Sequence, residues 1–194
     1  MRTAKIQRKT NETDIKIKLK IEGKGNYGIK TQIGFFTHML EAFAKHGLFD
    51  IELYAKGDLE VDQHHIIEDA GIVLGQAFKK AMGDKKGINR AGYFIFPMDE
   101  ALAIAAIDIS NRPYIQFNAQ FNRRFCGELD TDLLEDFFCG FSAGLGVNIA
   151  IKATGRSDHH KIEAIFKAFA KAMKTACSKD RCAFNILPST KGLL

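Results

Sequence analysis

The chain has 194 residues, of which 46% are hydrophobic and 26% charged, and its formal net charge is +5. This length fits one domain or two small fused repeats, with enough apolar residues for a sizeable, phenylalanine-rich core. Lysine and arginine are scattered, with neither a basic arm nor an Arg–aromatic platform, which argues against a nucleic-acid partner. The apolar runs fall short of the roughly 18 residues that a membrane span needs, so we expect no membrane partner.

The spacing of the cysteines helps to predict the cellular compartment of the protein. The four cysteines form no C-x-x-C pair, and no secretory leader pattern precedes the first strand pattern. Disulfides persist in oxidising compartments and are rare in the cytosol. We therefore expect reduced thiols and a cytoplasmic protein; the cysteines are Cys126, Cys139, Cys177 and Cys182.

The first half of the chain has the periodicity of three strands, a helix, a fourth strand and a second helix. Strands alternate apolar and polar residues, whereas helices place apolar residues three or four positions apart. The alternation is clearest at 14–22, where we expect Lys16, Lys18 and Lys20 to form the solvated face of a strand. The expected elements are strands at 1–10, 14–22 and 27–33, a helix at 35–46 ending at Gly47, a strand at 49–56, a polar loop at 57–63 and a helix at about 64–82.

The second half repeats this order. The expected elements are strands at 91–97, 101–110 and 113–121, a helix at about 130–143, a strand at 147–154, a helix at 159–178 and an irregular tail. Two such β-β-β-α-β-α units, 1–90 and 91–194, predict an α+β fold with an internal duplication. We expect the halves to form one compact domain, with twin helices packed on one face of each sheet.

The pattern His-His-x-x-Glu occurs once in each half and contains four of the six histidines. On a helix, His64 and Glu68 share a face and can chelate one ion, while His65 projects about 100° away. A lone His-His pair is usually a surface feature, but two pairs with Glu at the same offset predict paired metal sites. Imidazole with carboxylate suits Mn, Fe, Zn, Co or Ni. The second copy contains His159, His160 and Glu163.

Each half offers one further candidate ligand. His38 lies in the helix at 35–46, and Asp136 occupies the corresponding helix of the second half. The duplication therefore predicts that they are counterparts. The alternatives are a core-facing histidine beside Met39 for His38 and a solvent-facing carboxylate for Asp136.

Three cations flanked by turn-forming residues are candidates for holding a phosphate. Arginine offers planar bidentate contacts and lysine a mobile point charge, and a hydroxyl or backbone donor can add to them. Each is more often an ordinary surface charge, but beside a metal site they favour a phosphorylated substrate. The cations are Arg90, Arg112 and Lys191, with Ser189 and Thr190 next to the last.

Carboxylates at two predicted turns are candidates for a general acid or base, because an unpaired carboxylate near a metal can move a proton. They are Asp99 and Glu100 at one turn and Glu12 and Asp14 at the other. Ordinary turn chemistry is the alternative. His46 ends a helix, where a cation suits the helix dipole.

Several motifs in fixed order resemble the imidazoleglycerol-phosphate dehydratase family, in its monofunctional form. The resemblance implies a fold like domain 2 of ribosomal protein S5, a homo-oligomer of 24 subunits, and two manganese ions in each active site between subunits. The matching segments are 11–13, 36–40, 57–58, 62–69, 97–100, 108–113, 159–160, 163–168 and 188–192.

The resemblance also implies a role for each candidate residue. The metal ligands are His38, His64, His65, Glu68, Asp136, His159, His160 and Glu163. The substrate contacts are Glu12, His38, His46, Arg90, Arg112, Ser189, Thr190 and Lys191. The candidate catalytic residues are Glu12, Glu163 and His46. The chain departs from the family's usual pattern at Asp136 and Ala150, where many members have histidine.

The reaction that the resemblance implies removes water from imidazole glycerol phosphate and gives imidazole acetol phosphate, a step of histidine biosynthesis. We hypothesise that two manganese ions hold the substrate's ring as an imidazolate. Glu12 would move the side-chain proton, with Glu163 as the second choice. Two other interpretations remain: a dinuclear metallohydrolase acting on a phosphorylated substrate, and a non-enzymatic protein whose twin sites only bind metal or hold an oligomer together.

Overall fold

The computed structural model describes residues 1–180 and 182–194 and contains two sheets of four strands each. The first half comprises β1 (Thr3–Lys9), β2 (Thr13–Lys20), β3 (Tyr27–Lys30), α1 (Gly34–Gly47), β4 (Asp50–Gly57) and α2 (His64–Met82). The main elements of the second half are β5 (Ala91–Met98), β6 (Ala101–Asp108), β7 (Tyr114–Ala119), α3 (Leu134–Leu145), β10 (Asn148–Thr154) and α4 (Asp158–Cys177).

The two sheets have the same topology. The strand order is β1-β2-β4-β3 in the first sheet and β5-β6-β10-β7 in the second. In each sheet the third strand of the half pairs parallel with the fourth, and the other pairs are antiparallel. The predicted α+β fold with a duplicated β-β-β-α-β-α unit is therefore confirmed.

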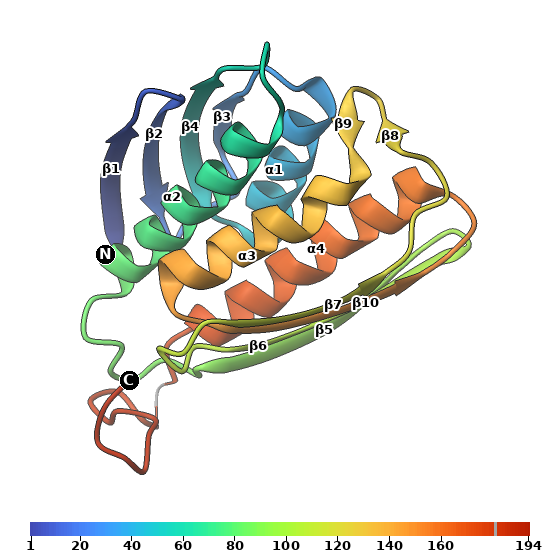
Figure 1. Ribbon diagram of the computed structural model, residues 1–194. Coiled ribbons are helices and arrows are strands. Elements are labelled where there is room, and N and C mark those ends of the chain that lie inside the picture. The colour runs from blue at the N-terminus through green and yellow to red at the C-terminus, as the bar shows by residue number, and fades with distance from the viewer. Residues whose placement is uncertain (181) are drawn as a thin grey trace.

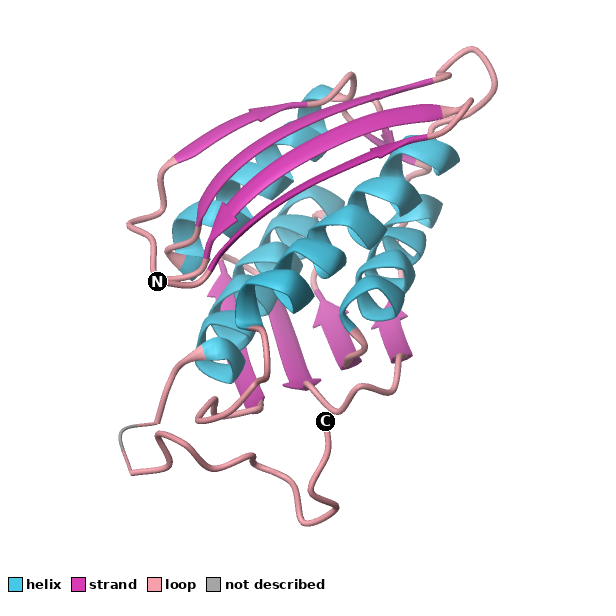
Figure 2. Cartoon of the chain, turned by 90° about the vertical axis from the view of Figure 1, so that its left-hand side faces the viewer, coloured by secondary structure: helices cyan, strands magenta, loops and turns pink. Residues whose placement is uncertain are grey.

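The four long helices lie between the two sheets (Figures 1 and 2). Helices α1 and α2 cover the first sheet, and α3 and α4 cover the second. Across the middle of the molecule, α2 packs on α3 and α1 packs on α4. Each helix pair therefore combines one helix from each half, and each sheet has one face that this chain's helices do not cover.

Strand alternation and the phenylalanines build the core. On β2, Ile15 and Ile17 are buried while Lys16 and Lys18 are exposed, which confirms the predicted solvated face. Aromatic contacts join the helix layers, with Phe43 on Phe169 and Phe78 on Phe141. The fully buried phenylalanines are Phe36, Phe43, Phe49, Phe78, Phe137, Phe138, Phe141, Phe166 and Phe169.

Glycines let the backbones of α2 and α3 approach each other closely. A Cβ on Gly71 would lie 2.2 Å from the carbonyl oxygen of Phe137, and one on Gly144 would lie 2.3 Å from that of Ile72. No side chain fits at such distances, so the crossing requires glycine. This close crossing holds the first turns of α2 and α3 beside each other.

The predicted helix at about 130–143 begins later than expected. Residues 125–130 form a short hairpin of β8 (Phe125–Cys126) and β9 (Leu129–Asp130) around Gly127, which has a positive φ of 58°. A 3-10 turn, η1 (Thr131–Leu133), follows and continues directly into α3. The Asp130 side chain accepts the N–H of Asp132 at 3.2 Å, so it caps the turn and keeps residue 130 out of the helix.

Candidate active site

The start of α2 places the ring of His64 between two carboxylates. The backbone N–H of His64 donates to Oδ1 of Asp62 at 2.9 Å, so the helix begins at the first motif histidine. Nε2 of His64 lies 3.7 Å from Oε2 of Glu68, and its Nδ1 lies 3.3 Å from Oδ2 of Asp136 on α3. Three predicted ligands thus lie together, but Asp136 and Glu68 face different nitrogens of the ring.

The start of α4 forms the matching cluster. The hydroxyl of Ser157 accepts the N–H of His160 at 3.4 Å and caps the helix. Nε2 of His159 lies 3.3 Å from Oε2 of Glu163, one turn further on. The ring of Phe35 on α1 lies 5.0 Å from that of His159 and 6.5 Å from that of His38. These contacts bring His38 to the same end of the α1–α4 pair.

The two clusters are related by the duplication. His38 precedes the first residue of β4 by the same number of residues as Asp136 precedes the first residue of β10. His38 is therefore the counterpart of Asp136, as the sequence predicted. Each cluster takes a His-x-x-x-Glu pair from one half of the chain and a third side chain from the other half, because α2 packs on α3 and α4 packs on α1.

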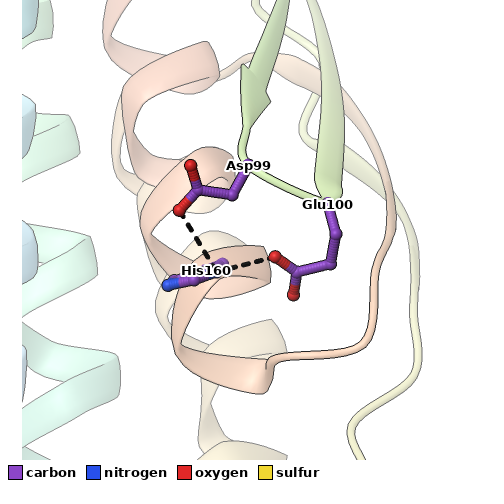
Figure 3. Close-up of side chains that lie close together, drawn as sticks. All are labelled: Asp99, Glu100 and His160. Atoms are coloured by element: carbon purple, nitrogen blue, oxygen red, sulfur yellow. Dashed lines mark hydrogen bonds and ion pairs between the residues drawn. The ribbon is translucent and has the colours of Figure 1, made fainter.

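His65 and His160, the second histidines of the motifs, each have a carboxylate partner at Nδ1. Nδ1 of His65 lies 3.0 Å from Oδ1 of Asp58, and Nδ1 of His160 lies 2.9 Å from Oε2 of Glu100. Figure 3 shows Asp99 and Glu100 converging on His160 from the β5–β6 turn. A carboxylate accepts, so Nδ1 donates and Nε2 of each neutral ring remains available to bind a metal.

These contacts shift the pKa values of the free protein. The Asp58 hydrogen bond raises the pKa of His65, and the Glu100 hydrogen bond raises the pKa of His160. In return, the His160 hydrogen bond lowers the pKa of Glu100 to about 2. His65 and His160 therefore stay protonated to a higher pH than an ordinary histidine in the metal-free protein.

Glu163 is held in its ionised form. Burial, the largest single cause, raises its pKa. The hydrogen bond from Nζ of Lys167, 2.7 Å from Oε1, together with the charges of Lys167, His38 and His159, outweighs burial, so the net pKa lies below the ordinary value. Lys167 also lies over the ring of Phe96. The centroid of that ring is 5.5 Å from the centroid of the His46 ring. Burial, followed by Lys167 and then Lys171, lowers the pKa of His46. His46 is therefore neutral at neutral pH and able to accept a proton.

Hydrogen bonds fix the backbone of the β1–β2 turn, which carries Glu12. The N–H of Glu12 donates to Oγ1 of Thr10 at 3.1 Å, and its carbonyl accepts the N–H of Asp58 at 3.1 Å. Oγ1 of Thr13 donates to the buried carboxylate of Asp69 at 2.5 Å. The side chain of Glu12 remains exposed, with Oε1 3.9 Å from Nε2 of His65. The turn therefore presents an exposed carboxylate beside a candidate metal ligand.

The predicted phosphate contacts gather elsewhere. Arg90 makes a bidentate contact to Asp108 at 2.6 and 3.0 Å, and its Nη1 donates to the carbonyl of Pro188 at 2.8 Å. The carbonyl of Arg112 accepts from Nδ2 of Asn148, which pairs with Asp108 across β6 and β10. Arg90, Arg112 and the tail bearing Ser189, Thr190 and Lys191 therefore share one end of the second sheet.

Within one chain this end is remote from the histidine clusters. Arg90 immediately precedes β5, whereas Asp99 and Glu100, which contact His160, immediately follow it. A strand of eight residues spans about 26 Å. A small phosphorylated substrate cannot bridge that distance, so one chain does not bring together all the predicted contacts.

The three surface hollows described next do not contain all of the candidate site residues. A cavity of about 330 Å³ lies beside His159 and is lined by Arg123, Cys126, Arg156, Ser157 and Asp158. Two larger hollows, of about 670 and 690 Å³, lie on the outer face of the first sheet among lysines. We favour the histidine clusters as the chemical site because donors converge there, whereas the lysine-lined hollows follow the open face of a sheet.

Three residues near the candidate site were assigned no role from the sequence: Asp58, Lys167 and Asp69. Asp58 and Lys167 lie in segments that match the family pattern, but their partners are distant in sequence or a helical turn away. Asp69 follows Glu68, and its buried contact to Thr13 depends on how α2 packs on β2. The signal that the sequence offered for all three was their place in segments that match the family pattern.

Fold and site together define the class: a duplicated α+β enzyme fold whose halves each present histidines and carboxylates at helix starts. The profile of the family described as "Imidazoleglycerol-phosphate dehydratase" matches residues 31–173. Curated dehydratases of this name from Koribacter versatilis and Caldanaerobacter subterraneus are 55% and 51% identical to the chain, each covering 100% of both sequences.

Solved structures agree. The imidazoleglycerol-phosphate dehydratase of Staphylococcus aureus superposes with a TM-score of 0.82 at 36% identity, covering 92% of this chain and 99% of that one. The Pyrococcus furiosus enzyme, solved in complex with (S)-C348, gives 0.84 at 34% identity, covering 97% and 100%. The chain belongs to the imidazoleglycerol-phosphate dehydratase family, carbon–oxygen lyases that dehydrate imidazoleglycerol phosphate in histidine biosynthesis.

None of the helices within the described ranges is long and apolar enough to cross a bilayer. All four cysteines are free thiols in the structure, in keeping with the sequence prediction.

Proposed function

We propose that this chain carries out the family's dehydration with two manganese ions in each active site. The observation that supports it most is the pair of equivalent clusters, in which imidazole and carboxylate donors from two helices converge. Donors that each bind an ion at about 2.1 Å lie about 3 Å apart. The His159–Glu163 separation of 3.3 Å and the His64–Glu68 separation of 3.7 Å are close to that value.

The donor set fits manganese, because nitrogen and oxygen ligands without thiolates suit this ion. His64, Glu68, His159, Glu163 and His38 would supply ligands directly. His65 and His160 would bind through Nε2, since Asp58 and Glu100 occupy Nδ1. When bound, the ions would lower the pKa of an imidazole ring that coordinates them. Asp136 would either ligate or, as its position suggests, orient His64 from Nδ1.

The protein's own residues would handle the substrate's side chain. Water leaves as a hydroxyl from the carbon beside the ring, together with a proton from the neighbouring carbon. Glu12 would take that proton, because its carboxylate is exposed beside His65. Glu163 is a weaker candidate, since Lys167 keeps it ionised and its pKa low. His46, which is neutral and lies at the end of α1, would accept or donate a proton on the side of the substrate away from Glu12.

The phosphate contacts would come from another copy of the chain. Arg90, Arg112, Ser189, Thr190 and Lys191 lie about one strand length from the clusters. A homo-oligomer, of 24 subunits as the family resemblance implies, would place one copy's arginines beside another copy's histidines and fix the substrate between subunits. The free thiols fit a cytoplasmic location.

Substitution of the proposed proton carrier tests this assignment. Glu12→Gln keeps the shape of the side chain but cannot take a proton, so turnover should fall by about 100-fold or more while KM changes little. Metal content should stay at the wild-type value. The matched control is Glu52→Gln, which makes the same change on the exposed face of the first sheet. Wild-type turnover in Glu12→Gln would remove Glu12 from the mechanism, and release of inorganic phosphate by the wild type would favour a hydrolase.

A further inference from the structure

A buried carboxylate ties α2 to the β1–β2 turn that carries Glu12. Asp69 on α2 is 6% exposed, and its Oδ2 accepts the hydroxyl of Thr13 at 2.5 Å. The same oxygen accepts Nη1 of Arg8 on β1, so an ion pair balances the buried charge. We name Arg8, Thr13 and Asp69 the polar triad. Its members come from three elements, and Thr13 directly follows Glu12 in the chain.

The polar triad reaches the backbone of Glu12 through a second hydroxyl. A threonine hydroxyl has one hydrogen to donate, and Thr13 donates its hydrogen to Asp69. In the 3.3 Å contact between the hydroxyls of Thr10 and Thr13, Thr10 is therefore the donor. Oγ1 of Thr10 in turn accepts the N–H of Glu12 at 3.1 Å and the N–H of Thr13 at 2.9 Å. The carboxylate on α2 thus sets the direction of each hydrogen bond as far as Glu12.

The second half of the chain has apolar residues at the three corresponding positions. The correspondence follows from the motif glutamates on α2 and α4, from the first residues of β2 and β6, and from the pairing of β1 with β2 and of β5 with β6. The counterparts are Phe96 for Arg8, Ala101 for Thr13 and Ala164 for Asp69. Both alanines are buried, as Thr13 and Asp69 are, so the fold can fill these positions without polar atoms.

Core packing therefore does not account for the polar triad. A buried carboxylate loses its hydration, and its partners must compensate for that loss. The apolar residues of the second half avoid this cost at the same places in the same fold. The residues of the triad are thus better explained by the turn that they hold than by the core that they fill.

The two turns differ in what holds them. Glu100 corresponds to Glu12, since each directly precedes the first residue of its strand, β6 or β2. Glu100 holds its own turn, because its Oε2 lies 2.9 Å from Nδ1 of His160 (Figure 3) and its Oε1 accepts the N–H of Ser157 at 2.7 Å. The Glu12 carboxylate is 55% exposed, and its Oε1 lies 3.9 Å from Nε2 of His65. In the first half the triad holds the turn, which leaves the Glu12 carboxylate available for a proton.

We propose that Asp69 is a positioning residue for the dehydration, and that it holds Glu12 in place through the two threonine hydroxyls. The inference rests on the proposed function, in which Glu12 takes the proton of the substrate. Helix α2 also carries His65 and Glu68, two of the proposed metal ligands. A substrate bound at those ligands would therefore meet Glu12 at a fixed distance. A displacement of about 1 Å can lower a rate by about 100-fold.

Replacement of the polar triad by its counterparts tests the proposal without leaving a buried polar group unpaired. The triple variant Arg8→Phe, Thr13→Ala and Asp69→Ala introduces residues that the second half already packs at these positions, so folding should be kept, as circular dichroism would check. We expect kcat to fall by about 10- to 100-fold, with KM and metal content close to the wild-type values. Wild-type kcat in the folded triple variant would overturn the proposal.

Combination with Glu12→Gln separates positioning from a general effect on structure. If the triad acts through Glu12, the triple change should lower kcat no further in a Glu12→Gln protein, because the group that it positions is already gone. A structural role would lower kcat in both backgrounds. Losses that multiply would show that Asp69 does not act through Glu12, and would overturn the proposal.

A pair of single substitutions decides the question if the triple variant does not fold. Thr13→Val keeps the shape of the side chain but removes the hydroxyl that joins Asp69 to Thr10, so kcat should fall. Thr13→Ser keeps the hydroxyl and should retain most of the turnover. The control is Thr3→Val, the same change at the exposed far end of β1. Equal turnover by Thr13→Val and Thr13→Ser would overturn the proposal.

Turnover by Glu12→Gln distinguishes a failure of this inference from a failure of the proposed function. Wild-type turnover in Glu12→Gln would remove Glu12 as the proton carrier and Asp69 with it. Lost turnover in Glu12→Gln, together with wild-type turnover in the folded triple variant, would remove only the role of Asp69.

Discussion

Asp136 lies where a single side chain can set the orientation of His64, a proposed metal ligand. It faces Nδ1 of His64, whereas Glu68 faces Nε2, so its carboxylate can fix the ring even where it does not touch the ion. Removal of such a partner lowers metal affinity by about 10- to 100-fold. We expect that loss for Asp136→Ala in a manganese titration, and little change for Glu135→Ala on the same turn. Equal manganese affinities for the two variants would show that Asp136 neither binds the ion nor orients the ring of His64.

The Glu100–His160 pair predicts a pH dependence in the metal-free protein. The pair raises the pKa of His160, so its stabilising effect is complete below the ordinary histidine pKa of 6.5 and is lost as pH rises through the folded value. It lowers the pKa of Glu100 to about 2 from 4.5, so the effect is complete above 4.5 and is lost as pH falls toward 2. The stability difference between wild type and Glu100→Gln should therefore be largest between pH 4.5 and 6.5.

Denaturant titrations at several pH values measure this difference. Imidazole resonances should also show the pKa of His160 falling toward its ordinary value in Glu100→Gln, because the main cause of its rise is gone. A pKa of His160 that does not move would mean that Glu100 is not its partner in solution.

At the scale of elements, the crossing of α2 and α3 sets the geometry of the first cluster. In an isolated helix alanine is favoured over glycine by about 1 kcal/mol. In Gly71→Ala the new methyl would overlap the carbonyl of Phe137, the residue after Asp136, so the helices must separate. We expect the free energy of unfolding to fall by about 1–3 kcal/mol and manganese binding to weaken. The control is Gly28→Ala, where nothing lies within 4 Å.

A stable Gly71→Ala protein with wild-type manganese affinity would show that the close crossing does not position His64 and Asp136.

The long elements could be predicted from sequence because their periodicity is strong. Helices at 35–46 and 64–82 and the alternating strand at 14–22 agree with α1, α2 and β2 within a few residues. The hairpin at 125–130 could not be predicted, because strands of two residues leave no periodic signal. The sequence predicts a helix start near Asp130 because 3-10 and α turns share their first residues.

The candidate site was predictable as a set of residues but not as an arrangement. Histidine pairs with glutamate one turn away could be read from spacing. The contact of His64 with Asp136 depends on two helices from different halves crossing, which no local pattern encodes.

At the scale of the whole molecule, one chain has two histidine clusters but keeps its predicted phosphate contacts about a strand length away. Duplication accounts for the clusters, since each takes its histidine and carboxylate side chains from both halves. We propose that assembly accounts for the rest, because a neighbouring copy would bring its arginines to the histidines. Metal binding, substrate binding and oligomerisation are therefore expected to depend on one another.

The most direct test is turnover by metal-stripped protein given imidazoleglycerol phosphate, with and without added manganese, with imidazole acetol phosphate as the product measured. We expect product only with manganese, and a metal content of two ions per active site at full activity. Full turnover by protein shown to contain no metal, or no turnover by folded protein loaded with manganese, would contradict the account.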